Sequence, residues 1–156
     1  MSGENTGNKS NPAEAQLSGI RLIKGSGLKG LAEPVVEGEI ILNRQPVSFL
    51  GDFDVETGQS TNPDHDIVER SISGKIFVFP SGVGSTVGSH SLINMSMNEA
   101  GPKAILVNHS DPIILLGCCV ANIPHIHRFQ DDIIEMLEDG MKVKVDSERG
   151  VVEVLD

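Results

Sequence analysis

The chain has 156 residues, and its 12 Lys and Arg against 22 Asp and Glu give a net charge of −10. This length fits a single domain. So acidic a chain is a poor candidate for unaided nucleic-acid binding, which needs a basic surface. Aromatic residues make up 3% of the chain and all of them are Phe, so platforms for stacking bases are not expected either.

The sequence carries no recognisable targeting segment. No apolar run approaches the ~18 residues of a membrane-spanning helix, and residues 1–16 are polar, without the apolar stretch of a secretory signal. Cys118 and Cys119 are adjacent and make no disulfide framework, so we interpret both as small buried hydrophobic residues. We therefore expect a soluble, cytoplasmic protein.

The polar composition of residues 1–18 predicts a disordered tail, and the domain is expected to span residues 19–156. Ile20–Lys24 and Gly38–Leu42 are the first predicted strands. A short apolar stretch, Val47–Leu50, then leads into a long polar loop. Loops of this length in a compact domain are often functional.

Two buried strands and a helix are predicted next. Lys75–Phe79 (KIFVF) is rich in β-branched and aromatic residues, which favours a buried strand that ends at Pro80. A helix is expected over Thr86–Ala100, where Gly101-Pro102 ends it. Lys103–Val107 (KAILV) is another predicted buried strand.

The C-terminal part contains an apolar run, Ile113–Leu116, and an amphipathic helix over Asp131–Asp139 that begins with acidic residues. Met141–Asp146 and Val151–Leu155 alternate charged and apolar residues, and the SERG between them predicts a β-hairpin. Taken together, these patterns indicate a mixed α/β domain with strands at both ends.

Residues 81–89 (SGVGSTVGS) lie between a predicted strand and a predicted helix. Glycines there allow a tight turn, and the start of a helix presents unpaired N–H groups that suit a carboxylate or phosphate. No Lys follows the last Gly, so this is not a Walker A loop, and a dinucleotide-binding spacing is also missing. The alternative is a plain strand-turn-helix with a Ser N-cap.

Two further groups of polar residues could carry chemistry. His125 and His127 would share one face of a strand and could ligate Zn or Fe, but no third ligand is evident; Arg128 could pair with an anion or serve at a surface or interface. The loop Gly51–Asp66 could bind a hard cation or act in acid–base chemistry, although its spacing matches no EF-hand and a solvated acidic loop is the alternative. Its titratable residues are Asp52, Asp54, Glu56, Asp64, His65 and Asp66.

Several motifs occur in an order that resembles the small subunit of the aconitase X family, archaeal members included. The likeness runs from about Gly38 to Pro124, which is most of the predicted domain. The motifs are Pro46-Val47-Ser48-Phe49-Leu50-Gly51, Asp54-x-x-Thr57-Gly58, His65, Ser73-Gly74-Lys75, Phe79-Pro80-Ser81-Gly82-Val83-Gly84-Ser85, Gly101-Pro102-Lys103-Ala104-Ile105 and Ile123-Pro124.

This resemblance implies an α/β fold like the swivelling domain of aconitase, a β/β/α arrangement with a barrel-like sheet. It implies a large-subunit partner in a heterodimer, which carries a 4Fe–4S iron–sulfur cluster and much of the active site. This chain would bind no cluster, since three cysteine ligands are needed and it has two, side by side. The implied reaction is dehydration of (R)-5-phosphomevalonate to trans-anhydromevalonate 5-phosphate in an archaeal mevalonate route to isoprenoids.

The resemblance also implies a serine base on the glycine-rich loop, here Ser85, with Ser89 as second choice. A helix N-terminus and its N–H donors stabilise an alkoxide, and the cluster iron acts as a Lewis acid on the leaving hydroxyl. We expect Asp54 and His65 near the substrate or the subunit interface. The residues expected to shape the anion pocket are Gly82, Gly84, Thr86 and Ser89.

One position departs from the family and three alternatives stay open. The family commonly has Gly-Arg-Gly-Ser at this loop, and Val83 replaces the Arg, so the charge for an anionic substrate would come from the large subunit or Arg128. The first alternative is an aconitase X-type dehydratase of another substrate, such as a hydroxyproline. The second is a non-catalytic interaction domain with Ser85 as an N-cap. The third is a free-standing metal hydrolase using three histidines: His65, His125 and His127.

Overall fold

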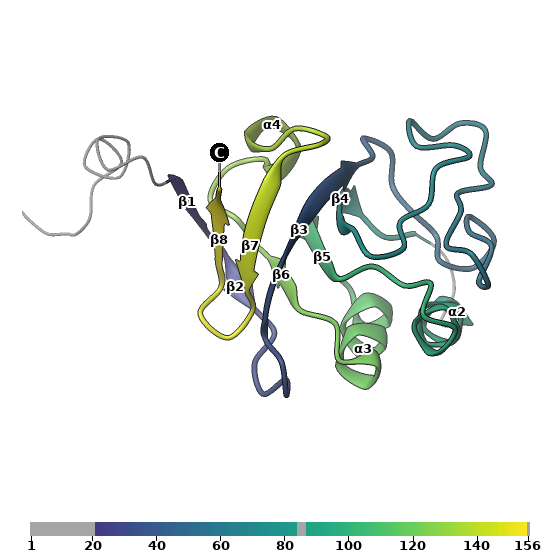
Figure 1. Cartoon of the computed structure of the whole chain (residues 1–156), viewed down its shortest axis with the longest axis horizontal. Coiled ribbons are helices and arrows are strands. Elements are labelled where there is room, and N and C mark those ends of the chain that lie inside the picture. Colours follow the sequence, from purple (N-terminus) through teal and green to yellow (C-terminus); the bar gives the residue numbers. More distant parts are fainter. Residues whose placement is uncertain (1–20, 84–86, 156) are drawn as a thin grey trace, which may run out of the picture.

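The computed structural model describes residues 21–83 and 87–155, so the predicted tail over residues 1–18 lies outside the described part. A mixed sheet carries helices on its faces (Figure 1). The elements are β1 (Arg21–Lys24), β2 (Ser26–Gly27), β3 (Val35–Leu42), β4 (Ile76–Ser81), α2 (Val87–Met97), β5 (Ala104–His109), α3 (Pro112–Ala121), β6 (His125–His127), α4 (Ile133–Met136), β7 (Lys142–Asp146) and β8 (Val151–Val154).

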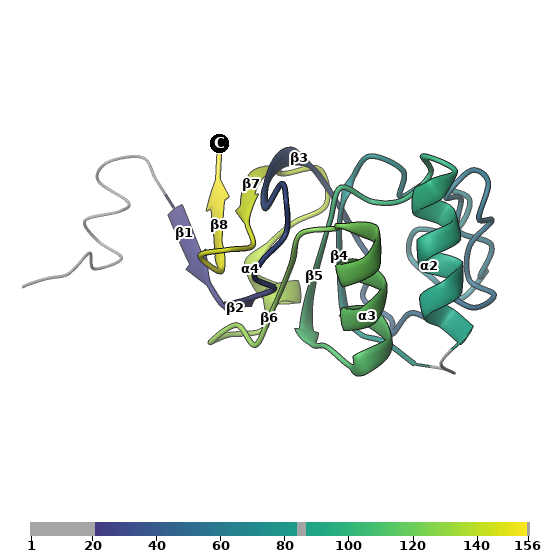
Figure 2. The same cartoon turned by 90° about the horizontal axis from the view of Figure 1, so that it is seen from below.

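The sheet has eight strands in the order β1-β8-β7-β3-β4-β5-β6-β2. The run β3-β4-β5-β6 is parallel, whereas β1, β8, β7 and β3 pair antiparallel. The edge strands β1 and β2 are consecutive in the chain, and Gly25 alone separates them. One short segment of chain therefore supplies both edge strands of the sheet (Figure 2). The predicted mixed α/β class is confirmed.

The central strands are buried on both faces. Phe77 and Phe79 of β4 enter a helix-side core that also contains residues of α2 and α3. Ile76 and Val78 enter a strand-side core with residues of β7, β8 and α4. Alternate side chains of a strand point to opposite faces. Two-sided burial explains why the sequence of this strand is an unbroken apolar run.

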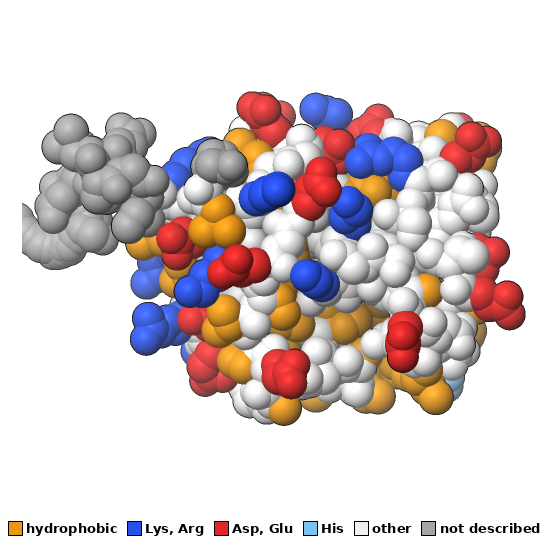
Figure 3. Space-filling model, in the orientation of Figure 1, with side chains coloured by type: hydrophobic (Ala, Val, Ile, Leu, Met, Phe, Trp, Pro, Cys, Tyr) orange, Lys and Arg blue, Asp and Glu red, His pale blue; other side chains and the backbone are white. Residues whose placement is uncertain are grey.

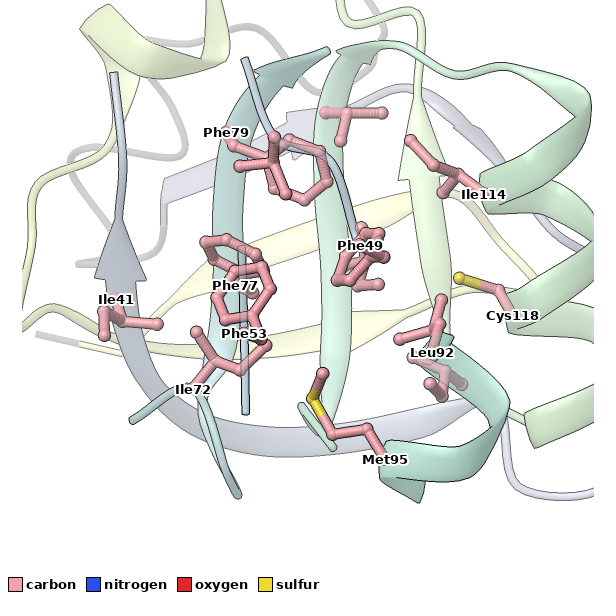
Figure 4. Packing of buried hydrophobic residues seen from close by; sticks show 14 of the residues in the cluster. Ile41, Phe49, Phe53, Ile72, Phe77, Phe79, Leu92, Met95, Ile114 and Cys118 are labelled. Atoms are coloured by element: carbon pink, nitrogen blue, oxygen red, sulfur yellow. The ribbon is translucent and has the colours of Figure 1, made fainter. Parts of the chain in front are cut away.

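Phe49, at the start of the long loop between β3 and β4, packs into the helix-side core (Figure 4). Its ring centroid lies 5.5 Å from that of Phe53, 5.9 Å from Phe79 and 6.3 Å from Phe77. The last two pairs meet edge to face, an arrangement that aromatic rings favour. The loop therefore belongs to the folded core at its start, although its sequence is polar.

Helix α3 contains the apolar run Ile113–Leu116 and continues to Ala121. Its start has a local signal, because Asp111 accepts a hydrogen bond from the Ile114 N–H at 2.9 Å and a proline occupies the first turn. An N-cap followed by proline is recognisable in a sequence. This helix was not predicted from the sequence, because a run of four apolar residues is too short to show a helical period.

The bounds of two other elements differ from the prediction. Strand β4 continues through Pro80 to Ser81, contrary to the prediction that Pro80 ends it; the fixed φ of proline is compatible with a strand, which loses one N–H donor. The helix predicted over Asp131–Asp139 is a single turn, α4. The C-terminal hairpin of β7 and β8 is confirmed. Within residues 21–83 and 87–155, no helix has the length and apolar character to cross a membrane.

The corner at which the sheet edges meet predicts a steric effect. A Cβ at Gly27 would overlap the Ser147 carbonyl oxygen, a backbone atom that cannot rotate away. We expect Gly27→Ala to lower the free energy of unfolding by about 1–3 kcal/mol, as overpacking does. Urea denaturation measures it. Ser26→Ala, at the exposed neighbouring position, is the control, and equal stability of the two variants would contradict the close approach.

Candidate functional site

The parallel strands bring residues from three loops to one edge of the sheet. The carboxyl ends of β4, β5 and β6 lie side by side, because these strands are parallel neighbours. The glycine-rich segment follows β4, Ser110 and Asp111 follow β5, and Arg128 follows β6. In α/β sheets, ligands bind beyond this edge. The candidate site is therefore built on the end of β4 and its two neighbours.

The start of the glycine-rich loop is held by backbone pairing with the chain that follows β3. The Val47 N–H donates to the Ser81 carbonyl at 3.0 Å, and the Val83 N–H donates to the Val47 carbonyl at 2.9 Å. Val47 is buried, so its backbone is a fixed partner. The loop leaves the sheet from a rigid point, as positioning of a reactive group requires.

Gly82 is needed because the chain after β5 approaches it closely. A Cβ at this position would lie 2.7 Å from Asp111 Oδ2 and 2.8 Å from Ile114 Cδ1. Asp111 is itself engaged as the N-cap of α3. Gly82 thus joins the candidate loop to the start of α3, and any side chain there would disturb that cap.

Three of the predicted site residues, Gly84, Ser85 and Thr86, lie outside the described residues, so the assignment of Ser85 as base stays a prediction. Ser89, the second choice, lies in the first turn of α2 and is 3% exposed. A Cβ at the neighbouring Gly88 would lie at van der Waals distance from residues 49 and 50 and from Ile113 of α3. The first turn of α2 therefore packs between the long loop and α3.

Asp54 is occupied by local structure in the long loop. Its carboxylate accepts a hydrogen bond from the Glu56 N–H at 2.8 Å, and its carbonyl accepts one from the Gly58 N–H at 2.7 Å. This is the pattern of an Asx turn, which aspartate often forms. The expectation that Asp54 lies near the substrate stays a prediction.

His65 is buried and has partners that the sequence did not identify. Its Nε2 lies 3.6 Å from Asp52 Oδ2 and 3.3 Å from Asn62 Nδ2. Asn62 also donates to Asp52 Oδ1 at 3.1 Å, and Asp52 accepts a hydrogen bond from the Ser48 N–H at 2.8 Å. The amide of Asn62 is a donor towards His65, so Nε2 accepts and the proton resides on Nδ1. This cluster holds the two ends of the polar loop together.

Within the described residues, His65 Nδ1 is buried without a hydrogen-bond partner. Buried polar groups are normally paired. The structure brings His65 to Asp52 and Asn62, and the Asp54 carboxylate faces its own turn. Spacing alone could not show this, because any of six titratable residues in the loop was an equal candidate.

His125 is fully buried beneath the same edge and is neutral. Its Nδ1 donates to the Ile105 carbonyl at 2.9 Å, since a carbonyl can only accept. Its Nε2 then accepts the hydroxyl proton of Ser110 at 2.8 Å. Burial lowers the pKa of His125 to about 4. Both ring nitrogens are engaged, which disfavours the metal-binding alternative at this residue.

Arg128 lines a hollow of about 520 Å³ that is bounded by residues 108–109 and 128–132. Its N–H donates to the Asn108 carbonyl at 3.1 Å, and its φ of 58° is unusual for a residue other than glycine. In the described part of the chain, no carboxylate is within ion-pair distance of its guanidinium. His109 pairs in register with Ser81, so the hollow adjoins the end of β4.

His127 lies next to this hollow along the chain. Burial, Arg128 and His109 together lower the pKa of His127.

The two cysteines do not behave alike. Cys118 is buried, as predicted, and burial raises the pKa of its thiol. Cys119 is exposed, so the prediction that both are buried was wrong for it, because adjacent residues of a helix face different sides. Among the residues described, no three His, Cys, Asp or Glu side chains gather to hold a metal ion. Two adjacent thiols, one of them in the core, do not fit an iron–sulfur cluster.

Similar sequences define the class of this protein. The phosphomevalonate dehydratase small subunit of Pyrococcus horikoshii is 48% identical over 81% of this chain and 92% of its own length. The one from Pyrococcus abyssi is 45% identical over 81% and 95%, and the one from Methanosarcina mazei is 40% identical over 76% and 83%. This chain is accordingly the small subunit of a dehydratase, a hydro-lyase.

The family follows from sequence and fold together. The model of the aconitase X swivel domain matches residues 27–154. The crystal structure of Thermococcus kodakaraensis aconitase X in its holo-form has a TM-score of 0.80 and 41% identity, covering 87% of this chain and 99% of that one. The chain belongs to the aconitase X swivel domain family. The resemblance inferred from motif order, and the swivelling-domain fold that it implied, are confirmed.

The neutral state of His125 predicts that stability depends on pH. Its pKa is about 4 in the folded chain and returns to about 6.5 on unfolding. Between these values the unfolded chain binds more protons, so stability falls as the pH drops from about 6.5 to about 4 and then levels off. The difference corresponds to roughly 3 kcal/mol.

Urea unfolding at a series of pH values measures this loss. The variant His125→Gln should show a flatter dependence than the wild type, whereas His90→Gln, at an exposed histidine, should leave the slope unchanged. Identical slopes for all three proteins would refute the assignment.

Proposed function

We propose that this chain is the small subunit of a phosphomevalonate dehydratase, which converts (R)-5-phosphomevalonate into trans-anhydromevalonate 5-phosphate in a mevalonate route to isoprenoids. The observation that carries the proposal is the likeness to relatives of that name, at 40–48% identity over 83–95% of their lengths. The active site is shared with a large subunit. The iron–sulfur cluster belongs to that subunit, because the cysteines of this chain do not fit one.

Ser85 is the proton acceptor in this proposal. It stands two residues before α2, and two residues span at most about 7 Å, so the start of the helix is within reach. The first turn of a helix offers unpaired N–H groups and a partial positive charge, which stabilise an alkoxide. The first turn of α2 has no acidic residue to oppose it. Ser89 is buried, which supports Ser85 over Ser89.

The reaction removes one proton and one hydroxide from adjacent carbons. The electron pair of the broken C–H bond forms the C=C double bond, and hydroxide leaves from the neighbouring carbon. Ser85, as the alkoxide, takes the proton and becomes the neutral hydroxyl; when the serine gives this proton up again, proton and hydroxide together amount to the water that is the second product, and the alkoxide is restored. We propose that Gly82, Gly84, Thr86 and Ser89 line the anion pocket, as the resemblance to the family implies.

Hydrogen bonds within the Asp52–Asn62–His65 cluster hold the long loop, and Phe49 packs its start against β4. We propose that His65 orients the loop for the substrate or the large subunit, and that Asp54 contributes through the turn it stabilises. Burial of His65 and the hydrogen bonds of both residues within the loop support this proposal.

The serine role predicts a specific loss in Ser85→Ala. Dehydration of 5-phosphomevalonate should fall by about 10²–10⁴-fold, the usual contribution of a general base, when the chain is combined anaerobically with its large subunit. Ser96→Ala, near the other end of α2, should retain activity. If Ser85 were only an N-cap, its loss would cost about 1 kcal/mol of stability and leave turnover intact.

The same assay tests the substrate. Wild-type complex that carries the cluster but does not turn over 5-phosphomevalonate would overturn this substrate and favour another hydroxy acid or a hydroxyproline. Failure of the two chains to form a complex would overturn the subunit role itself.

Arg128 is the charge that we propose for the substrate anion in place of the family arginine at Val83. Arg128→Ala should raise KM about 10-fold or more with little change in kcat, since a charge-assisted hydrogen bond to bound substrate is removed. Arg149→Ala, at an exposed arginine that pairs with Asp146, is the matched control. Unchanged KM in Arg128→Ala would assign the anion to the large subunit.

A further inference from the structure

Helices α2 and α3 carry no Asp, Glu, Lys or Arg in their eleven and ten residues, although 22% of the chain is charged. Both helices lie on the outside of the sheet, side by side (Figure 2). A surface helix normally has charged residues on its outer face. Helices without charge at a surface are typical of a face that another protein covers, because charged residues are depleted at interface cores.

Large hydrophobic side chains are exposed on and around these helices. On α3, Leu116 is 54% and Val120 is 59% exposed. Residues 116, 119 and 120 share one face of the helix, whereas Gly117 meets Leu92 of α2 and Cys118 enters the core. Four further residues complete the set, which we call the apolar face: Leu50, Val83, Val87 and Met97.

At the start of α2, the backbone beside Val87 lies close to Leu50 and to α3. Gly88, beside Val87, lies 3.5 Å from Ile113 and 3.7 Å from the Leu50 backbone nitrogen, measured from a Cβ position built on the glycine. Hydrophobic side chains gather along the lower edge of the molecule, where α3 and α2 lie, whereas Lys and Arg side chains lie on the left and over the centre and upper half of this view (Figure 3). Patches of this kind mark interaction sites.

We propose that the apolar face docks the large subunit of the dehydratase, with Leu116, Cys119 and Val120 near its centre. This inference rests on the proposed function for the existence of that subunit. Val83 and Val87 flank the candidate catalytic loop, so a chain that completes the active site at this loop must also cover them. That continuity favours the large subunit over a second copy of this chain, which would bury the loop against itself.

Cys119 provides a probe of this face in the unmodified protein. Its thiol is exposed beside Leu116 and Val120, whereas burial raises the pKa of Cys118 and keeps that thiol unreactive. The rate of N-ethylmaleimide modification at Cys119 is measured by mass spectrometry of the small-subunit peptide, in the free chain and in the anaerobic complex. We expect at least 10-fold slower modification in the complex.

Substitutions provide a second, independent readout. Leu116→Lys places a charge on an exposed position of the apolar face and should weaken binding to the large subunit by at least 10-fold. Leu22→Lys makes the same change on β1, at the opposite end of the molecule, where the side chain is 46% exposed. It should bind like the wild type. Matching thermal unfolding of both variants shows that they are folded.

Each result decides between the alternatives. Equal modification rates in a proven complex, or Leu116→Lys that binds like the wild type, would overturn the apolar face as the docking site while the dehydratase function stands. A free chain that is dimeric by light scattering, with Cys119 already protected, would assign the face to a second copy. Absence of any complex with wild-type chain would overturn the proposed function and this inference together.

Discussion

The burial of β4 on both faces is the constraint on which the rest of the structure depends. Its residues Ile76–Phe79 are fully buried, and each such side chain contributes about 1.5–3 kcal/mol by leaving water. A strand that is apolar on both sides is stable only where other layers cover it. Helices α2 and α3 supply one layer, and β7, β8 and α4 supply the other. This requirement accounts for the position of both layers.

The candidate site takes its rigidity from the end of that strand. Val47 pairs with the backbone on both sides of Gly82, and Gly82 in turn has α3 against its α-carbon. Below them, neutral His125 joins β5, β6 and Ser110 through hydrogen bonds that leave neither ring nitrogen free. The start of the glycine-rich segment, from Ser81 to Val83, is thus held in a fixed position by backbone hydrogen bonds.

The surface of the domain around the glycine-rich segment is also typical of one part of a larger assembly. Among the described residues no three metal-ligating side chains gather, and helices α2 and α3, beside the glycine-rich segment, carry no Asp, Glu, Lys or Arg. A domain that worked alone would need charges on those helices for solubility and a complete set of catalytic groups at the loop. Both features are consistent with a domain that forms half of a site, and the apolar face and the glycine-rich loop share one boundary at Val83 and Val87.

Sequence patterns were sufficient where a signal is local. Unbroken apolar runs predicted β4 and β5, alternation predicted the hairpin of β7 and β8, and the order of motifs identified the family. Two expectations in α3 were incomplete although the information was local. Cys119 is exposed although Cys118 is buried, because the rotation of α3 turns one thiol to the core and the next to the surface. The helix around Ile113–Leu116 was missed because too few residues were used to see its period.

The sequence by itself determined the class of fold, the family and the loop on which chemistry was expected, since each of these depends on residue types at fixed spacing along the chain. Tertiary structure alone decided that His65 meets Asp52 and Asn62, that Gly82 lies against Asp111, and that Ser110 donates to His125. The last two pairs join residues 29 and 15 positions apart. Within the polar loop, the sequence offered six titratable residues and did not show which of them lie together. Spacing carries no information about such pairs, because they form only when the sheet brings separate loops to a common edge.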